Sequence, residues 1–450
     1  MARGGGRPGL AGRRPGLDPP VHPVLTRTRD LAVLLLAPAL AALVGFLQIT
    51  HSRLATLGVA GVGLVGLVAA SPAALPVLAF PAIWVPGQRV AGLLSVGDAV
   101  LAIAAVLVLL DSTRAPLSRA GRALITVLGL LLATDMVAVL AHPTRQGVQE
   151  IMHRLILVGG GIQVGAWLAE RGKLATALRL LVTVSLAFAL VAIADRLATG
   201  QAAYPLGYHK NFAGPGFATA AILLLAAPDA LHLAVLSRVR WVSFAVLLAG
   251  LLATSSRGAI LGFALAVTVW ILRPGTGHRR VNPVLGALLV AGLGYVGVSS
   301  VQRQLTDQAR GIMTIDSLTQ RQMVETATRD LWRTSPLTGV GPRFFTTPDY
   351  PTAQAPNNMF DEALAEAGVL GALGLAVFVV GGVVLTYRVR TPIGQAANMV
   401  VLAAFFHGQV DIFWANGQAL NWLVVGAAVG GLTANHEKVR SAARLALVES

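Results

Sequence analysis

The stretch RWVSFAVLLAGLLATSSRGAILGFALAVTVWILR, residues 240–273, decides the fold class. It holds most of two apolar runs, 239–253 and 258–272, joined by a short polar turn with a single arginine. Such runs recur along almost the whole chain of 450 residues, which is 55% hydrophobic and 12% charged, with a mean hydropathy of +0.70. A soluble domain of this size needs far more charge to cover its surface, so the bilayer is the main solvent of this protein.

The length and continuity of these runs predict helices. Only α-helices and closed β-barrels satisfy their backbone hydrogen bonds inside hydrocarbon, and the runs lack the alternation of barrel strands. Crossing about 30 Å of hydrocarbon takes about 20 apolar residues, so we predict an all-α integral membrane protein with about 12–14 transmembrane helices. We expect helices near 31–49, 54–70, 72–86, 96–110, 123–141, 149–168, 174–194, 212–228, 239–253, 258–272, 281–298, 362–386, 395–413 and 417–434. The 72–86 segment is short and holds Pro72, Pro76 and Pro81, so it fits this series least well.

The pattern divides the chain into five expected parts. Residues 1–30, rich in Gly, Pro and Arg, are predicted to be a disordered basic cytoplasmic tail. Residues 31–298 form the first part of the helical bundle, and 361–434 supply its last helices, followed by a cytoplasmic tail at 435–450. Residues 299–360 are predicted to form one long extracytoplasmic loop with short helices, and loops of this length are usually functional.

Arginine-rich loops set the predicted orientation. With the N-terminus in the cytoplasm, the loops at 112–122, 170–173, 229–240, 273–280 and 387–394 all face the cytoplasm, as the positive-inside rule requires. This orientation places the whole net charge of +15 on the cytoplasmic side. The basic balance therefore indicates topology and contact with anionic lipid, not nucleic acid. The chain has no cysteine, which excludes disulfides and thiolate metal sites.

Ionisable residues in apolar helices are costly, so each is a candidate for function. They gather at the predicted outer helix ends: Asp98, Asp135, Glu150, Arg154, Asp195, Arg257, Asp361, Glu362, Glu366 and Asp411. For Asp98, Glu150 and Asp195 we expect the simpler role of charges that reach the membrane interface.

Arg257 lies in TSSRGAILG, residues 254–262, where only residues 254–257 separate two predicted helices. A hairpin this tight places the guanidinium at the membrane surface beside three hydroxyls, and Gly258 allows a close approach. The planar donor fork of arginine matches phosphate oxygens. The alternative is an arginine that anchors the turn to lipid headgroups.

The predicted outer loop contains a second basic segment, QRQMVETATRDLW, residues 320–332. An amphipathic helix over 318–332 places Arg321, Glu325 and Arg329 at i, i+4 and i+8. For Glu325 and Arg329 we expect a solvated ion-pair ladder. Arg321 lies near the helix start, where it can turn toward the bilayer.

Two further segments run from polar residues into helices. In APNNMFDEALAEAG, residues 355–368, Asn357 or Asn358 can cap a helix whose positive end Asp361 and Glu362 complement. Glu366, one turn deeper on the same face, is harder to explain by capping. In YPLGYHKNFAGPG, residues 204–216, the sequence His-Lys-Asn at 209–211 lies at an outer helix mouth, either as an interfacial anchor or as a binding group.

Taken in order and spacing, these motifs resemble the bacterial O-antigen ligase and O-antigen polymerase family of polytopic membrane glycosyltransferases. The resemblance covers residues 204–432 and rests on TSSRGAILG, QRQMVETATRDLW with PLTGVGPRFF, APNNMFDEALAEAGVLGALG, and HGQVDIF. It implies outer-leaflet transfer of a saccharide from a polyprenyl (undecaprenyl or decaprenyl) diphosphate to an acceptor hydroxyl on a glycan, lipid or protein. It implies no metal and no other cofactor, with Arg257 and Arg321 holding the diphosphate.

One position departs from the family pattern. The family usually has a His-Asn pair before the helix that follows the loop, and Asn357 stands where the histidine is expected. Asparagine has no titratable proton near neutrality and cannot be a general base. Either Glu362 or Asp361 takes that role, or the leaving group alone drives the reaction once two arginines neutralise it, or this chain is not an active ligase.

The predicted catalytic residues are Arg257, Arg321 and Glu362. The predicted substrate-binding residues are His209, Lys210, Asn211, Arg154, Arg343, Asn357, Asn358, Asp361, Glu366 and Asp411. Ligation and chain polymerisation both fit this pattern. The rival from another class is a transporter or flippase for lipid-linked glycan, which would carry its ionisable groups near the bilayer midplane. The outer position of the charges and the long outer loop favour the enzyme.

Overall fold

The structure, a computed structural model, describes residues 71–84 (except 72), 89–90, 94–111, 117–232, 237–273, 317–346, 356–410 and 419–431, with the single residues 286, 294 and 298. Several expected features lie outside these described residues: the tails 1–30 and 435–450, the helices near 31–49 and 54–70, most of the helix 281–298, and residues 299–316 and 347–355 of the outer loop.

The described chain has two short antiparallel strands of two residues each, β1 (Arg89–Val90) and β2 (Leu94–Ser95). Its other regular elements are helices. The helices long and apolar enough to cross a membrane are α5 (Arg119–Ala141), the run α6–η2–α7 (Arg145–Glu170), α8 (Leu174–Thr199) and α14 (Met359–Arg388). Shorter apolar helices are α4 (Val96–Leu110), α11 (Arg257–Leu272) and Ala419–Gly431. The prediction of an all-α integral membrane protein is confirmed, and the number of spans stays a prediction.

One expected helix is wrong. Residues 72–86 do not form a span, because the described part contains only a single turn, α3 (Ala74–Leu78), and a 3₁₀ turn, η1 (Pro81–Trp84). Proline lacks an N–H and its ring clashes with the preceding turn, so the four prolines of this segment, Pro72, Pro76, Pro81 and Pro86, break the helix. Trp84 at the end of η1 is buried, and its indole N–H donates to the Ser185 hydroxyl of α8 at 2.9 Å.

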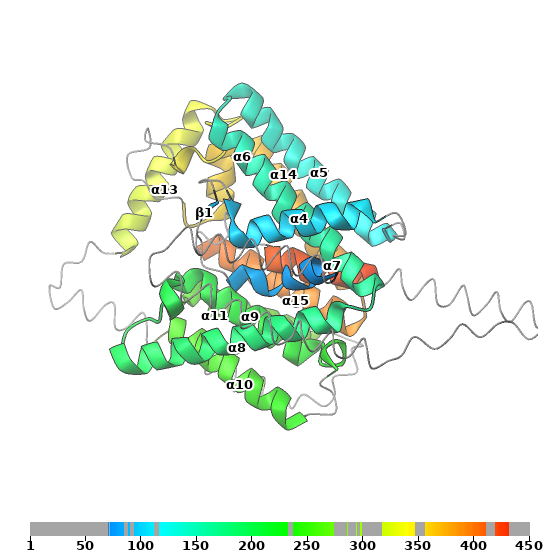
Figure 1. The fold of residues 1–450 in the computed structure, drawn as a ribbon. Helices are drawn as coiled ribbons and strands as arrows, with labels where there is room; N and C mark the ends of the chain where they lie inside the picture. Colours follow the sequence, from blue (N-terminus) through cyan, green and yellow to red (C-terminus); the bar gives the residue numbers. More distant parts are fainter. Residues whose placement is uncertain are drawn as a thin grey trace, which may run out of the picture. The chain divides into compact units, whose positions relative to one another are not determined.

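The core is built around α9 (Lys210–Ala226), whose side chains are mostly buried. This helix packs against α8, α10 (Ser237–Thr254), α11 and α15 (Pro392–Val410). Small residues allow the close approach, since a Cβ at Gly214 would lie 3.0 Å from the Ser256 Cβ. Because α15 also packs against α14, which in turn lies along α5, it joins this group to the rest of the bundle (Figure 1).

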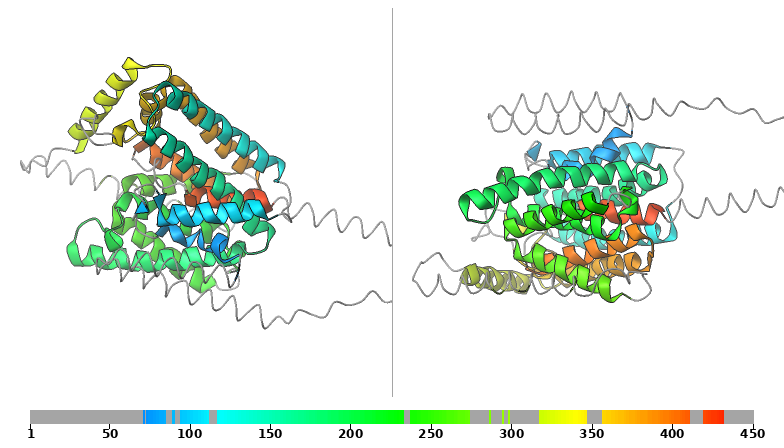
Figure 2. Two further views of the ribbon diagram at one scale, coloured as in Figure 1. Left: turned by 45° about the horizontal axis from the view of Figure 1, so that its top comes forward. Right: turned by 90° about the horizontal axis from the view of Figure 1, so that it is seen from below.

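Shorter elements connect the long helices: η3 (Pro205–Gly207), η4 (Asp229–Leu231), α13 (Ser317–Thr334) and η5 (Phe344–Thr346). The amphipathic helix expected over 318–332 is confirmed as α13. It packs against α14 and, in the views of Figures 1 and 2, lies at the edge of the helical group. Ala327 and Leu331 of α13 cover a small apolar cluster made by Phe345 and Ala365.

Helix ends that the sequence assigns to the cytoplasm lie together. Arg273, after α11, donates to the backbone carbonyl of Tyr387 at the end of α14 and lies over its ring at 4.2 Å. Trp167 and Arg171, at the end of α7, both contact the Asp111 carboxylate after α4. The starts of α11 and α14 are therefore at the opposite ends of these helices, where the candidate residues are.

Candidate functional site

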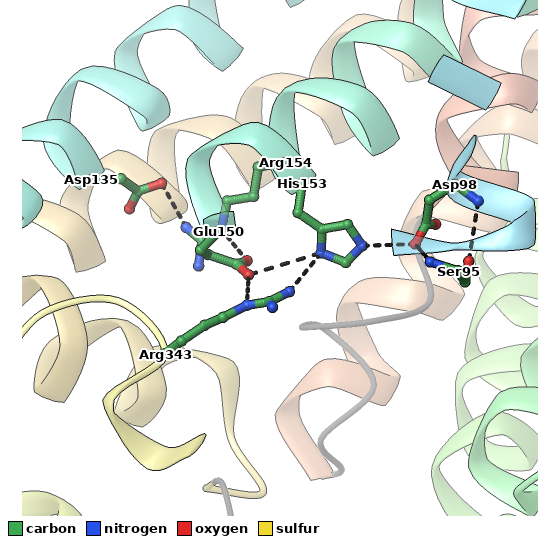
Figure 3. Close-up of polar contacts among 7 residues, drawn as sticks. All are labelled: Ser95, Asp98, Asp135, Glu150, His153, Arg154 and Arg343. Carbon is green, nitrogen blue, oxygen red and sulfur yellow. Dashed lines mark hydrogen bonds and ion pairs between the residues drawn. The ribbon is translucent and has the colours of Figure 1, made fainter. Parts of the chain in front are cut away.

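A buried network of charged side chains links α5 and α6 to the segment that follows α13 (Figure 3). Arg154 donates from Nε to Glu150 Oε1 at 2.9 Å and from Nη1 to Asp135 Oδ2 at 2.7 Å. Arg343 donates from Nε to the other oxygen of Glu150, Oε2, at 2.5 Å. The side chains of Asp135 and Glu150 are only 3% and 5% exposed. Glu150 is therefore held between two guanidinium groups, away from water.

His153 extends this network to α4. Its Nδ1 lies 3.0 Å from Arg343 Nη2, and its Nε2 lies 3.3 Å from Asp98 Oδ2. The same Nδ1 also lies 3.9 Å from Glu150 Oε2, so the ring stands between two carboxylates and the Arg343 guanidinium. Asp98 forms a capping box with Ser95 at the start of α4. A π-helical turn, η2 (Leu155–Gly160), follows α6 directly, and such turns are frequent at functional sites.

The expectation that Asp98 and Glu150 simply reach the membrane interface is wrong. Both carboxylates bond inside the network, because His153 and two arginines lie within reach of them. Asp195, the third member of that expectation, is half-buried and accepts a hydrogen bond from the Tyr204 N–H at 2.9 Å.

Two further acids, Glu362 and Glu366, lie one turn apart on α14 and are 8% and 3% exposed. The charges of Arg154 and Arg343 act on Glu362, and the charge of Arg154 acts on Glu366. The two acids therefore border the Glu150 network on its α14 side. A hydroxyl brought to this place would meet carboxyl groups, which can take up its proton.

The part of α14 that carries these acids is set off by a break at Gly368 (φ 66°, ψ −164°). Backbone groups freed by the break are bonded by residues 336–341: Val340 N–H donates to Ala365 O at 2.8 Å, Gly341 N–H to Glu366 O at 2.9 Å, and Val369 N–H to Pro336 O at 2.9 Å. The fit requires glycine, because a Cβ at Gly339 would lie 2.3 Å from the backbone carbon of residue 366. Residues 336–341 thus complete the broken helix.

Arg257 is the first residue of α11 and is half-buried. The tight hairpin expected here is confirmed, since α10 ends at Thr254 and Ser255 takes a left-handed φ of 53°. At this point α11 touches the end of α15, because a Cβ at Gly258 would lie 2.3 Å from the ring of His407. His407 itself is buried.

The start of α14 meets the same end of α15. Asn358 caps the helix by accepting from the N–H groups of Phe360 at 2.8 Å and Asp361 at 3.4 Å. Its Nδ2 lies 3.3 Å from Gln409 Oε1 on α15. Asn357, half-buried, precedes the cap. Two motifs about a hundred residues apart in sequence are therefore brought together by α15.

The start of α9 lies beside the hairpin, through the packing of Gly214 already described. His209 caps this helix, with its Nδ1 accepting from the Asn211 N–H at 3.3 Å; it is exposed, whereas Lys210 and Asn211 are half-buried. The Tyr208 hydroxyl donates to a backbone carbonyl of η1 at 2.6 Å. Burial, with the Asp98 charge nearby, raises the pKa of Tyr208 to about 12, so this donor keeps its proton at neutral pH. The α9 start therefore lies near the Asp98 end of the network.

On α13 the two arginines have different surroundings. Arg329 pairs with Glu325 on the exposed surface, which confirms the expected solvated ladder. Arg321 is half-buried and shares a helix face with the buried residues Val324 and Thr328, at i, i+3 and i+7. Arg321 therefore lies on the side of α13 that faces the protein.

Sequence reasoning missed His153. Its signal was present, because Glu150, His153 and Arg154 lie at i, i+3 and i+4 on one face of a helix that enters an apolar run. Asp411, a predicted binding residue, lies outside the described residues. Within the described part of the chain, no group of three or more His, Asp and Glu side chains has the arrangement of a metal site.

Residues 242–376 match the model of a family described as O-antigen ligase. The matched range begins in α10 and ends in α14, so it contains Arg257, Arg321, Arg343 and Glu362 but not Glu150. The resemblance inferred from the sequence motifs is thereby confirmed. A search of curated proteins gave no match.

Proposed function

We propose that this chain, whose residues 242–376 match the model of a family described as O-antigen ligase, acts in cell-envelope glycan assembly as a glycosyltransferase of the extracytoplasmic face of the bacterial cytoplasmic membrane. It moves a saccharide from a polyprenyl diphosphate to an acceptor hydroxyl without a metal. The observation that carries the proposal is the meeting of the Arg257 and Asn358 motifs at the end of α15, with the buried acids of α14 beside them.

The diphosphate of the donor suits the starts of α9, α11 and α14. A helix start carries the positive end of the helix dipole, which favours anions. Lys210 and Arg257 are the first residues of two of these helices, and Arg321 lies on α13, which packs against the third. Negative charge collects on the departing diphosphate in the transition state, so fixed positive groups here accelerate the reaction.

The acceptor hydroxyl suits the acidic side of the site. Glu362 takes the hydroxyl proton as the acceptor oxygen bonds to the anomeric carbon of the donor saccharide. The bond from that carbon to the diphosphate breaks, and its electron pair leaves with the diphosphate. Glu362 is buried and lies within reach of the charges of Arg154, Glu150 and Arg343, so it is the acid of this site that the network surrounds. Asn357 cannot perform this step, because an amide has no basic site near neutrality.

A transporter of lipid-linked glycan would share one feature with this structure, the broken helix α14. Here, however, the freed backbone groups are bonded by residues 336–341, so they do not coordinate a passing substrate. Ligation and polymerisation differ in the acceptor and share the chemical step, so the same site serves both.

The test is transfer by the purified full chain in proteoliposomes, with a synthetic undecaprenyl diphosphate disaccharide as donor and envelope polysaccharide as acceptor. We expect free undecaprenyl diphosphate and polysaccharide-linked disaccharide to appear in equal amounts. Arg257→Ala should slow the appearance of both products at least about tenfold, and Arg329→Ala, which breaks an exposed ion pair with Glu325, should retain them. Donor that crosses the bilayer with its diphosphate bond intact would establish the transporter instead.

The face of action has its own test, because a chain without cysteine accepts single reporter thiols. Thr334→Cys, at the end of α13, should be labelled by an impermeant maleimide in intact cells. Arg390→Cys, after α14, should be labelled only after permeabilisation. Both positions are exposed. The reverse pattern would put the site in the cytoplasm.

A further inference from the structure

The first part of α14, residues 359–367, is not held by continuous helix, because the backbone leaves the helical conformation at Gly368. It is held instead by the outer segment, residues 336–346, whose backbone bonds to the carbonyls of residues 365 and 366. Glu362 and Glu366 both lie on this first part. Whatever fixes the outer segment therefore also fixes the two acids.

Arg343 supplies the charged contacts of the outer segment with α6, beside Gly341 and Pro342, which lie against His142 and Gly147. Its backbone takes a left-handed φ of 62°, which a residue with a side chain adopts only where its surroundings enforce it. Its side chain points into the network of Figure 3, with Nε bonded to Glu150 and Nη2 to His153. The guanidinium therefore fastens the segment to α6 in two places.

The partners of Arg343 are themselves held in place. Glu150 is bonded by Arg154 on the opposite oxygen, and His153 is bonded by Asp98 from the start of α4. Rotation of either side chain would break a buried polar interaction, which is costly where no water can replace it. The anchor for Arg343 is thus preorganised by three helices, α4, α5 and α6.

We propose that Arg343 is a positioning residue: it fastens the outer segment onto the break in α14 and so fixes Glu362 and Glu366, rather than binding the substrate. The part of this proposal that concerns Glu362 as a base rests on the proposed function. The fastening itself does not, so the two can fail separately.

Accessibility of a thiol tests the fastening without any assay of transfer. Ala365 is fully buried and packs against Phe345 of the outer segment. Its backbone carbonyl accepts a hydrogen bond from the Val340 N–H of the same segment. In an Ala365→Cys background, Arg343→Gln should raise the rate of maleimide labelling at least about tenfold, because the segment opens more often. The matched control is Arg333→Gln, an arginine of the same region whose side chain is 71% exposed and pairs with Asp330 at the surface.

Transfer kinetics test what the fastening does. Arg343→Gln should lower kcat and leave KM for the undecaprenyl diphosphate disaccharide nearly unchanged. Combined with Glu362→Gln it should add little, because both changes remove the same positioned carboxylate. Arg343→Lys, which keeps the charge beside Glu150, should recover part of the kcat and, in the Ala365→Cys background, part of the protection of the introduced thiol. If Arg343→Gln does not fold, Arg343→Lys is the variant to compare with the parent protein in both the labelling and the kinetic measurements.

The outcomes separate the alternatives. Unchanged labelling together with a raised KM would make Arg343 a direct substrate ligand and overturn the proposal. Unchanged labelling with unchanged transfer would overturn it as well. Raised labelling in a protein whose parent transfers no saccharide would support the fastening and reject the proposed function.

Discussion

The network around Glu150 and the helix starts around Arg257 both contain arginines in a mostly apolar protein, yet their surroundings differ. Arg154 and Arg343 lie among buried carboxylates that bond them directly. Arg257 and Lys210 begin helices, so the N–H groups and dipoles of those helices add to their positive charge. The first arrangement pairs arginine with carboxylate inside the protein, whereas the second places basic residues at helix starts, where the helix dipole favours anions. Residue type alone therefore does not tell a structural arginine from a binding one.

This comparison divides the proposed reaction between two sides of one site. The basic side, with Arg257 and Lys210, suits the diphosphate that leaves. The acidic side, with Glu362 and Glu366 against the Glu150 network, suits the hydroxyl that attacks.

The largest effect is expected from Glu362→Gln. Glutamine keeps the shape of the side chain but cannot accept the hydroxyl proton, so turnover should fall about 10²- to 10⁴-fold. The matched control is Glu366→Gln, one turn deeper, which should cost much less if it does not contact the hydroxyl. The measurement is single-turnover transfer at saturating donor. Near-normal turnover of Glu362→Gln would mean that the leaving group alone drives the reaction.

A structural effect of similar size is expected from Glu150→Ala. Removing this carboxylate leaves two buried guanidinium groups without their shared partner, and breaking a buried ion pair costs about 3–5 kcal/mol. The measurement is the free energy of unfolding of the detergent-solubilised protein. Asp330→Ala, which breaks an exposed pair with Arg333, should cost no more than about 1 kcal/mol. Equal destabilisation by the two variants would remove the distinction between the regions.

The basic side should respond in activity and not in stability. A hydrogen bond to a charged group contributes about 1.5–3 kcal/mol, so Arg257→Ala should slow transfer about ten- to a hundredfold for each hydrogen bond to the diphosphate that it removes. Arg257→Lys keeps the charge without the planar donor fork and should retain part of the activity. Arg321 should behave alike. Transfer rates of purified variants with unchanged unfolding free energy are the measurement, and tolerance of alanine at both arginines would contradict the diphosphate site.

Sequence patterns predicted the parts of this protein that depend on local chemistry. The helices, the hairpin before Arg257 and the amphipathic α13 follow from hydropathy, turn residues and periodicity. The wrong helix at 72–86 shows the limit, because apolar character alone does not overcome proline.

The buried network could not be predicted, because its bonds join residues far apart in the chain. Glu150 and Arg343 are 193 residues apart, and His153 and Asp98 are 55 residues apart. Spacing within α6 could have indicated that Glu150, His153 and Arg154 share a face, but not which carboxylates they meet. The break at Gly368 was equally hidden, because a glycine in an apolar helix is common in membrane proteins and gives no sign of the segment that fills it.

The smallest effect is expected at Asn357, where the chain departs from the His-Asn pair of the family. The second member of that pair has a structural role here, since Asn358 caps α14 and reaches Gln409. Asn357→Ala therefore removes at most one neutral hydrogen bond, about 0.5–1.5 kcal/mol, or about two- to tenfold in transfer rate.

The Asn357→His variant tests whether Glu362 has the proton-accepting role that the resemblance gives to a histidine at position 357. If Glu362 takes the proton, an imidazole at 357 adds a second base near the same hydroxyl, and transfer should stay equal or rise. In a Glu362→Gln background the same change should restore part of the turnover, because a base is again within reach of the start of α14. Asn358→Ala is the control, since removing the cap should cost about 1 kcal/mol of stability and leave the base untouched. Complete loss of transfer in a well-folded Asn357→Ala protein would show that the amide itself acts on the substrate, and the division of the site into a basic and an acidic side would then need a third group between them.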